Sequence, residues 1–160
     1  MSLVALWVSH TKGREKLVKA RMKIIELLHK LPTVVGQCLF SIQSKIKKIA
    51  GNFVDCKSLY ILGKGQGTAI AFEGALKIKE ITYIHAEGLS SGALKHGPLA
   101  LIDSATKNAS KVIIIILDDG YLKDNMTTLS EVKSRNGFTF VITDCYEKLE
   151  KDLIDEYIEI

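Results

Sequence analysis

The sequence predicts an α/β protein, a three-layer α/β/α sandwich built on a mainly parallel sheet. Two observations carry this prediction. From residue 58 onward the chain alternates short apolar runs with helical patterns, and the run from Val112 to Leu117 consists of Val, Ile and Leu alone. Such unbroken runs are typical of parallel strands that helices cover on both faces. Because parallel strands are joined by right-handed crossovers, helices are expected on both sides of the sheet.

The region ahead of the sheet predicts helices within residues 14–51. Residues 15–30 carry apolar side chains at the spacing of an amphipathic helix. Pro32 should end this helix, because a proline disfavours the helical conformation of the residue before it. A second helix is then expected from Thr33 to Ala50, with Gly51 as its stop signal.

The α/β core is expected to span residues 57–160. A strand at Ser58–Leu62 leads into a glycine turn, and a helix begins near Thr68. A break is expected around Gly88–Gly92, with His85 capping or packing the end of the preceding helix. The later elements, in chain order, are the strand Val112–Leu117, the helix Leu122–Arg135, the strand Phe138–Thr143 and a last strand Tyr157–Ile160. Because no linker or repeat divides the 160 residues, one domain over 1–160 is expected.

Composition excludes several classes of function. The chain is 47% apolar and 25% charged, which is ordinary for a globular protein. Basic residues crowd positions 12–57 and acidic residues positions 144–159, but aromatic residues are not interleaved with the basic ones, as nucleic-acid binding would require. No apolar run is long enough to cross a bilayer, and the first residues predict no signal peptide.

Cysteine and histidine usage predicts neither disulfides nor a metal site. The three cysteines (Cys38, Cys56 and Cys145) are widely spaced, so a reducing, cytoplasmic location is expected. The four histidines are scattered and no Cys-x-x-Cys occurs, so no metal is predicted. No cofactor is expected either.

Gly63, Gly65 and Gly67 form a glycine turn between a strand and a helix, where a backbone can approach an anion. Their spacing does not match the dinucleotide fingerprint, whose third glycine follows the second by three residues, and no Walker sequence is present. The pattern alone favours a tight structural turn over an anion site.

The helix that follows the turn carries the strongest chemical candidate. At about 100° per residue, Glu73, Lys77 and Glu80 lie within about 60° of one another, whereas Lys79 points elsewhere. Spacing alone favours surface ion pairs worth a few tenths of a kcal/mol. The functional alternative is a carboxylate base beside an ammonium, an arrangement suited to moving a proton between adjacent sugar carbons.

His96 is the third candidate. It lies between glycines in Gly92-Ala-Leu-Lys-His-Gly-Pro, so a loop or a helix end is expected there, where catalytic groups often lie. The imidazole of a histidine can donate or accept a proton near neutral pH. A structural loop histidine is the alternative on local grounds.

Two long motifs together resemble a known family. The segments EGALKIKEITYIHAEG (Glu73–Gly88) and LKHGPLALID (Leu94–Asp103) are similar to the isomerase half of the glutamine–fructose-6-phosphate aminotransferases. LGKG (Leu62–Gly65) resembles that family's LGRG turn, and LHKLP fits the lead-in to its second SIS (sugar isomerase) domain. The resemblance is dense from Leu59 to Asp103, and it implies a SIS domain with a flavodoxin-like fold.

The resemblance implies a role for each candidate. In that family fructose 6-phosphate is aminated with ammonia from glutamine, and a proton then moves from C1 to C2 to give glucosamine 6-phosphate. Glu80 is the expected base for this transfer and Lys77 its acid–base and electrostatic partner. His96 is expected to assist ring opening and to reach the active site of the other subunit of a homodimer. Glu73 is assigned the orienting of Lys77, as a hypothesis.

Some features depart from the family pattern. Lys64 replaces the usual arginine, and a lysine lacks the forked geometry with which a guanidinium makes bidentate contacts. Ala93 replaces the usual glutamate. The family's Ser/Thr-rich phosphate loop, which lies in its first SIS domain, has no counterpart here. Its glutaminase domain and lysine-bearing C-terminal tail also fall outside this sequence, so the 160 residues alone are expected to be inactive. Two alternatives stay open: another SIS-type phosphosugar isomerase or deglycase, and a non-catalytic SIS module for binding or dimerisation.

Overall fold

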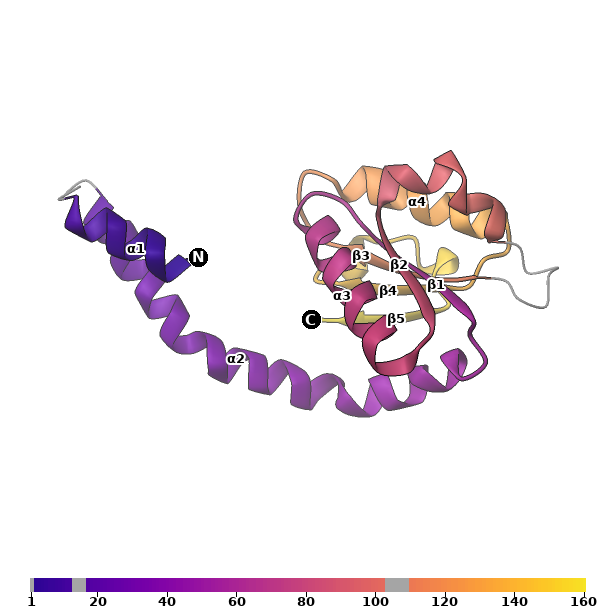
Figure 1. Cartoon of the computed structure of the whole chain (residues 1–160), viewed down its shortest axis with the longest axis horizontal. Coiled ribbons are helices and arrows are strands. Elements are labelled where there is room, and N and C mark those ends of the chain that lie inside the picture. The colour runs from indigo at the N-terminus through magenta and orange to yellow at the C-terminus, as the bar shows by residue number, and fades with distance from the viewer. Residues whose placement is uncertain (1, 13–16, 103–109) are drawn as a thin grey trace. The chain divides into compact units, whose positions relative to one another are not determined.

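The computed structural model describes residues 2–12, 17–102 and 110–160. The chain divides into two compact units, residues 1–43 and residues 44–160, which we call the helix-pair unit and the α/β unit (Figure 1). Two ends of predicted segments, the helix start at 14–16 and Asp103 of the second motif, lie outside the described residues.

The helix-pair unit consists of α1 (Ser2–Thr11) and the greater part of α2 (Val18–Ala50). The prediction that Pro32 ends a helix is wrong, because α2 runs through it without a break. A proline inside a helix loses one backbone hydrogen bond and crowds the carbonyl four residues earlier, at a cost of about 3 kcal/mol. Helix formation is cooperative, so a helix of 33 residues that continues to Ala50 can absorb that local cost.

The α/β unit is built on a five-stranded sheet of order β2-β1-β3-β4-β5 in which every neighbouring pair is parallel. This confirms the predicted α/β class with a parallel sheet and helices on both faces. The strands are β1 (Ser58–Gly63), β2 (His85–Ser90), β3 (Lys111–Ile116), β4 (Thr139–Thr143) and β5 (Glu156–Glu159). The helices between them are α3 (Gln66–Thr82) and α4 (Leu122–Ser134), with short 3-10 turns η2 (Gly51–Phe53), η3 (Ser91–His96), η4 (Pro98–Leu101), η5 (Tyr146–Lys148) and η6 (Lys151–Leu153).

Strand β2 was not predicted. His85 is its first residue and not the end of a helix, and Gly88 lies within it and not in a break. The preceding helix α3 ends at Thr82, where Tyr83 adopts a left-handed conformation with φ 61°. The sequence of β2 hides the strand because it is an edge strand of mixed composition, in which small residues face α3 and polar residues face away.

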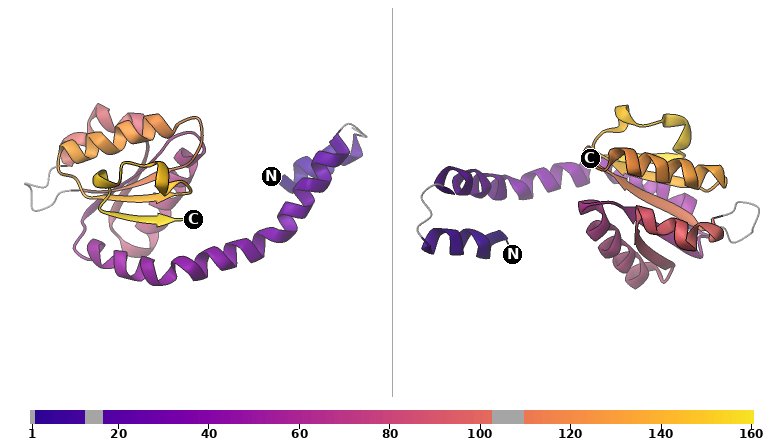
Figure 2. Two further views of the ribbon diagram at one scale, coloured as in Figure 1. Left: turned by 180° about the vertical axis from the view of Figure 1, so that it is seen from behind. Right: turned by 90° about the horizontal axis from the view of Figure 1, so that it is seen from above.

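Helices α3 and α4 cover opposite faces of the sheet, as the views from behind and above show (Figure 2). The main core lies on the α4 side, where Leu62, Ile114 and Val141 pack with Leu129 of α4. Successive strand residues alternate between the faces. Ile61 accordingly approaches Gly74 of α3 on the other side.

On the α3 side the sheet also borders an apolar hollow of about 620 Å³. Ile46 and Ile49 at the end of α2 line it, together with Ile78 from the last turns of α3, Ile113 from β3 and Phe140 from β4. The end of α2 and the helix α3 therefore both contribute to the layer on this face, which completes the three-layer arrangement.

Asp155 holds the edge strand β5 to the rest of the sheet. Its carboxylate accepts hydrogen bonds from the backbone N–H of Thr139 at 2.8 Å and from Nζ of Lys133 at 2.8 Å. Burial by itself would raise the pKa of Asp155, but the hydrogen bonds from Lys133 and Thr139 outweigh it and the pKa is lowered. The carboxylate thus stays charged and links α4, β4 and β5.

Helix α3 approaches strand β2 closely at Gly88, and this contact yields a stability prediction. A Cβ added to Gly88 would lie 2.6 Å from Cα of Phe72 and 2.7 Å from the carbonyl oxygen of Ala71. Because both are backbone atoms, α3 would have to shift. We expect Gly88→Ala to lower the free energy of unfolding by about 1–3 kcal/mol in urea denaturation. Gly92→Ala, with no atom within 4 Å of the added Cβ, is the control and should change it by less than about 0.5 kcal/mol. Equal stabilities for the two variants would contradict this packing argument.

Candidate active site

The predicted charged group on α3 is present. Nζ of Lys77 lies 3.0 Å from Oε2 of Glu80 and 3.6 Å from Oε1 of Glu73. The lysine thus lies between the two carboxylates and donates a hydrogen bond to Glu80. Helical spacing alone predicts this contact, and the structure confirms it.

The packing of α3 explains why these three side chains point outward. The inner face of the helix carries small residues, of which Gly67, Ala71 and Ala75 are buried. At about 100° per residue, Glu73 lies roughly 160° away from both Ala71 and Ala75. The close contact of the inner face with β1 and β2 therefore fixes which side of α3 faces away from the sheet.

The ion pair sets the charge state of the lysine. The hydrogen bond to Glu80 raises the pKa of the Lys77 ammonium above its usual value, and the negative charges of Glu80 and Glu73 add to this effect. Lys77 therefore remains an ammonium at neutral pH. It can stabilise a developing negative charge or donate a proton, whereas Glu80 is the member of the pair that can accept one.

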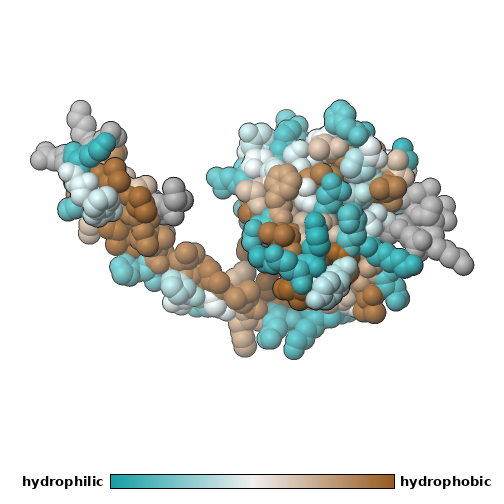
Figure 3. Space-filling model, viewed as in Figure 1, coloured by the Kyte–Doolittle hydropathy of each residue, from teal (hydrophilic) through white to brown (hydrophobic). Residues whose placement is uncertain are grey.

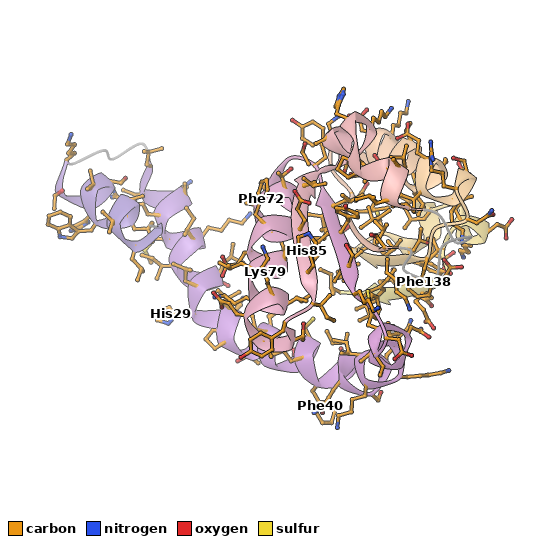
Figure 4. The ribbon with its side chains drawn as sticks, turned by 45° about the vertical axis from the view of Figure 1, so that its right-hand side comes forward. His29, Phe40, Phe72, Lys79, His85 and Phe138 are labelled. Atoms are coloured by element: carbon orange, nitrogen blue, oxygen red, sulfur yellow. The ribbon has the colours of Figure 1, made fainter. Side chains whose placement is uncertain are left out.

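The pair lies on an exposed surface. The side chains of Lys77 and Glu80 are 53% and 52% exposed, and neither lines the apolar hollow beneath α3. Exposed apolar side chains flank the pair, Leu76 on one side and Ile70 and Ile81 on the other. At about 100° per residue, Lys79 lies about 160° away from Lys77 around the helix. Figure 4 labels Lys79 on α3. A small molecule bound at Glu80 would need further walls, which the residues described around it do not supply.

The glycine turn before α3 is filled by protein atoms. A Cβ on Gly65 would lie 2.6 Å from the ring of Tyr121, and one on Gly63 would lie 2.3 Å from the carbonyl oxygen of Gly67. Lys64 pairs with Asp124 at 2.6 Å, across the turn in the first turn of α4. This arrangement supports a structural role for the glycine turn, and the ion pair of Lys64 with Asp124 links the turn to α4.

His96 is exposed and is the last residue of η3. This turn packs on the α4 side of the sheet: Ser91 donates a hydrogen bond to Asn125 at 2.8 Å, and Lys95 pairs with Glu131 at 2.6 Å. The charged group on α3 lies on the opposite face. The structure therefore brings Glu73, Lys77 and Glu80 together and places His96 and Lys64 apart from them.

A polar cluster at the carboxyl ends of β3 and β4 was not found from the sequence. The backbone N–H of Asp118 donates a hydrogen bond to Asp144, and Nζ of Lys148 pairs with the Asp118 carboxylate. These residues are far apart in the sequence and meet only because β3 and β4 are neighbours. Within the described residues, no group of three or more His, Cys, Asp or Glu side chains is placed to hold a metal ion.

The fold and this pair define the class of protein: a flavodoxin-like α/β module that carries a candidate proton-transfer pair on the outer face of its first crossover helix. Comparison with known proteins identifies the family. The SIS domain family matches residues 52–149, and the chain belongs to it.

Several relatives of the chain are glutamine–fructose-6-phosphate aminotransferases. The chain is 39% identical over 143 residues to the glutamine–fructose-6-phosphate aminotransferase (isomerizing) of Rhizobium meliloti, which covers 89% of the chain and 23% of that protein. It is 38% identical over 142 residues to glutamine–fructose-6-phosphate aminotransferase (isomerizing) 2 of Homo sapiens, covering 89% of the chain and 20% of the relative. The chain thus spans about a fifth to a quarter of the length of these relatives.

Solved structures agree with this assignment. The C-terminal domain of glucosamine-fructose-6-phosphate aminotransferase from Francisella tularensis superposes with a TM-score of 0.78 at 34% identity, covering 88% of this chain and 38% of that one. A tagatose-6-phosphate ketose/aldose isomerase from Escherichia coli has a TM-score of 0.54 at 20% identity over 78% of this chain and 36% of that one, and that likeness shows the fold alone.

The ion pair on α3 predicts a measurable titration. We expect the pKa of Lys77, followed by NMR of its side chain, to lie above 10.5 and to fall toward that value in Glu80→Gln. Because this pKa is raised on folding, the pair stabilises the fold below about pH 10.5, and the contribution is lost as the pH rises through the higher value. Glu73→Gln is the matched control and should lower the pKa less, since Glu73 is the more distant carboxylate. If the pKa of Lys77 fell further in Glu73→Gln than in Glu80→Gln, Glu80 would not be its main partner.

Proposed function

We propose that this chain supplies part of the isomerase site of a glutamine–fructose-6-phosphate aminotransferase, which makes glucosamine 6-phosphate from fructose 6-phosphate in amino sugar (UDP-GlcNAc) biosynthesis. The observation that carries the proposal is the contact between Lys77 and Glu80, within a chain 39% identical to such an enzyme over 143 residues. In this proposal residues 1–160 act as one SIS domain of a cytoplasmic enzyme. Its N-terminal helices are α1 (Ser2–Thr11) and α2 (Val18–Ala50), and its core spans residues 57–160.

Glu80 is the proposed base. After fructose 6-phosphate has been aminated, the carboxylate of Glu80 removes the proton from C1 of the sugar and returns it at C2. A single group can do both because the two carbons are adjacent. Half-exposure leaves the carboxylate accessible to a substrate. The Lys77 ammonium donates a hydrogen bond to this carboxylate at 3.0 Å, which holds it in place on the helix.

Lys77 is the proposed electrostatic partner. Its raised pKa keeps it charged, so it can stabilise the negative charge that develops on the sugar when C1 loses its proton. Glu73, 3.6 Å away on the other side, holds the ammonium in position along the helix. Lys64, tied to Asp124, supports the turn that starts this helix.

A second unit must complete the site. The pair lies on an outward helix face flanked by Leu76 and Ile81, a surface suited to contact with another folded unit. We propose that the first SIS domain of the enzyme packs here and brings the phosphate-binding loop, and that the glutaminase domain supplies ammonia. His96 lies across the sheet from Glu80, which supports a role for His96 in ring opening at the site of the neighbouring subunit of a homodimer.

Binding or dimerisation without catalysis is the second candidate function. The observation that favours it is the exposure of Glu80 and Lys77 outside the apolar hollow, since a SIS module kept for association needs no enclosed site. Action on a different phosphosugar is the other alternative. Activity assays distinguish these two alternatives from the main proposal.

The exposed site predicts that the 160 residues alone are inactive. Without a phosphate-binding loop and a source of ammonia, the purified chain should form no glucosamine 6-phosphate from fructose 6-phosphate with either glutamine or ammonium. The assay is product detection by mass spectrometry, with the full-length Rhizobium meliloti relative as positive control. Turnover by the isolated chain would refute the need for a second unit.

Restoring the missing parts should reveal the role of Glu80. We would replace the matching segment of the Rhizobium meliloti enzyme with this chain and measure interconversion of fructose 6-phosphate and glucose 6-phosphate. Glu80→Gln removes the base while keeping the shape, so the rate should fall by about 10²-fold or more. Glu73→Gln, on the same helix face, is the matched control and should have a smaller effect.

Each other outcome of this experiment points to a different function. An unchanged rate in Glu80→Gln would exclude Glu80 as the base. An inactive chimaera that still binds fructose 6-phosphate would favour the non-catalytic module. Stronger inhibition by another phosphosugar than by fructose 6-phosphate would indicate a different isomerase substrate.

A further inference from the structure

The turn that carries His96 is held on α4 by a buried polar contact. The hydroxyl of Ser91 donates a hydrogen bond to the side-chain carbonyl of Asn125 at 2.8 Å, and each of the two residues is 1% exposed. Polar side chains are costly to bury, and one hydrogen bond does little more than offset that cost. A pair of apolar side chains would bury more favourably at this place, so the polar pair calls for an explanation other than stability.

Two further contacts hold η3 on the same helix. Lys95 pairs with Glu131 at 2.6 Å. Leu94 is fully buried in the core cluster that also contains Leu129 of α4. Ser91 and Lys95 are four residues apart in a 3-10 helix, which spans about 8 Å, and their partners are six residues apart in an α-helix, which spans about 9 Å. The two elements are therefore joined at both ends over matching lengths.

The surface above α4 and η3 is largely hydrophilic. Figure 3 shows mostly teal and white residues there, whereas brown surface gathers along α1 and α2. Large apolar patches mark surfaces on which other molecules pack, and this face lacks that character. The buried contact of Ser91 with Asn125 is therefore best explained by what η3 itself carries, which is His96 at its last position.

The backbone is restricted on both sides of His96. Before it, η3 is held on α4 through Ser91. After it, Gly97 has φ 141°, a conformation that residues with a side chain rarely adopt, and Pro98 begins η4 with a fixed φ of its own. A satisfied buried polar contact also specifies one arrangement, because sliding η3 along α4 would separate the hydroxyl of Ser91 from the carbonyl of Asn125. The exposed imidazole therefore leaves the surface from a backbone of fixed direction.

We propose that Ser91 and Asn125 are positioning residues for His96: their contact holds η3 in one register on α4 and so aims the imidazole. The use of that imidazole in ring opening rests on the proposed function. In that step the C2–O5 bond of the sugar ring breaks, the hydroxyl on C2 loses a proton as the carbonyl forms, and O5 gains a proton. A group that transfers a proton must lie within about 3.2 Å of the atom it serves, so a displaced turn slows the step.

NMR relaxation of the 160-residue chain tests the positioning directly. We expect the backbone order parameter of His96 to be about 0.85, as in a rigid backbone, and to fall below about 0.6 in Ser91→Ala. Ser91→Ala/Asn125→Leu should have the same effect, and it covers the case in which the single variant fails to fold, because it leaves neither polar group of the contact without its partner. Thr128→Val is the matched control, since it removes a hydroxyl that bonds within α4 to the carbonyl of Asp124. A flexible His96 in the wild type, an unchanged order parameter in either variant, or an equal fall in the control would overturn the proposal.

A comparison of two substrates separates positioning from general damage. In the Rhizobium meliloti chimaera, Ser91→Ala/Asn125→Leu should slow the formation of amino sugar phosphate from fructose 6-phosphate by about 10- to 10²-fold, as for a reacting group displaced by about 1 Å. The analogue 5-deoxyfructose 6-phosphate lacks the hydroxyl that closes the ring, so it is always open and its conversion should be unchanged. Both products are measured by mass spectrometry. An equal loss of rate on the two substrates would indicate a merely structural contact and overturn the proposal.

Glu80→Gln in the same chimaera distinguishes failure of this inference from failure of the proposed function. Loss of the base should slow both substrates, because the transfer from C1 to C2 follows ring opening and is needed by each. If Glu80→Gln leaves both rates unchanged, or if the chimaera forms no product at all, the proposed function fails. The order parameter of His96 in the 160-residue chain then decides the positioning without reference to any activity.

Discussion

The close contact between α3 and the two strands β1 and β2 determines where the chemistry lies. Gly88 admits the backbone of α3 at Ala71 and Phe72, and Gly74 meets Ile61 of β1. These contacts fix the rotation of α3 about its axis. Because residues repeat at a fixed angle around a helix, Glu73, Lys77 and Glu80 must then face away from the sheet. The residues that matter for the proposed reaction are thus positioned by glycine and alanine on the opposite side of the same helix.

That placement explains the separation between fold and function in this chain. The sheet completes its main core on the α4 side, with Leu62 and Ile114 fully buried, and this core needs no other protein. The pair of Lys77 and Glu80, by contrast, lies on an exposed surface, half-exposed to solvent. A carboxylate and an ammonium on such a surface can hold a charge arrangement but cannot enclose a sugar phosphate. In the proposed function, the SIS fold therefore supplies reactive groups, and their use requires a partner surface that supplies binding.

The sequence was informative where one physical rule dominated. The run at Val112–Leu117 predicted a central strand because only two-sided burial tolerates six apolar residues in succession, and helical spacing predicted the contact between Lys77 and Glu80. The prediction failed where tertiary contacts decide. Strand β2 is short, polar on one side and glycine-containing, so only its pairing with β1 makes it a strand. The sequence around Pro32 predicts a helix end because the local rule includes the cost of the proline but not the stability of the helix on either side. The meeting of Asp118 with Asp144 depends on the strand order, which local patterns do not encode.

The relation between His96 and Glu80 follows from the same topology. Two right-handed crossovers that proceed in opposite directions across the sheet, as β1 to β2 and β2 to β3 do here, lie on opposite faces. The α3 crossover leads from β1 outward to β2, and η3 then turns from the end of β2 onto the other face to pack against α4. A side chain at the end of η3 is consequently separated from the outer face of α3 by the sheet itself. If both residues serve one reaction, they must do so from different copies of the fold. The requirement for more than one copy of the fold then arises from the handedness of strand connections, before any interface is considered.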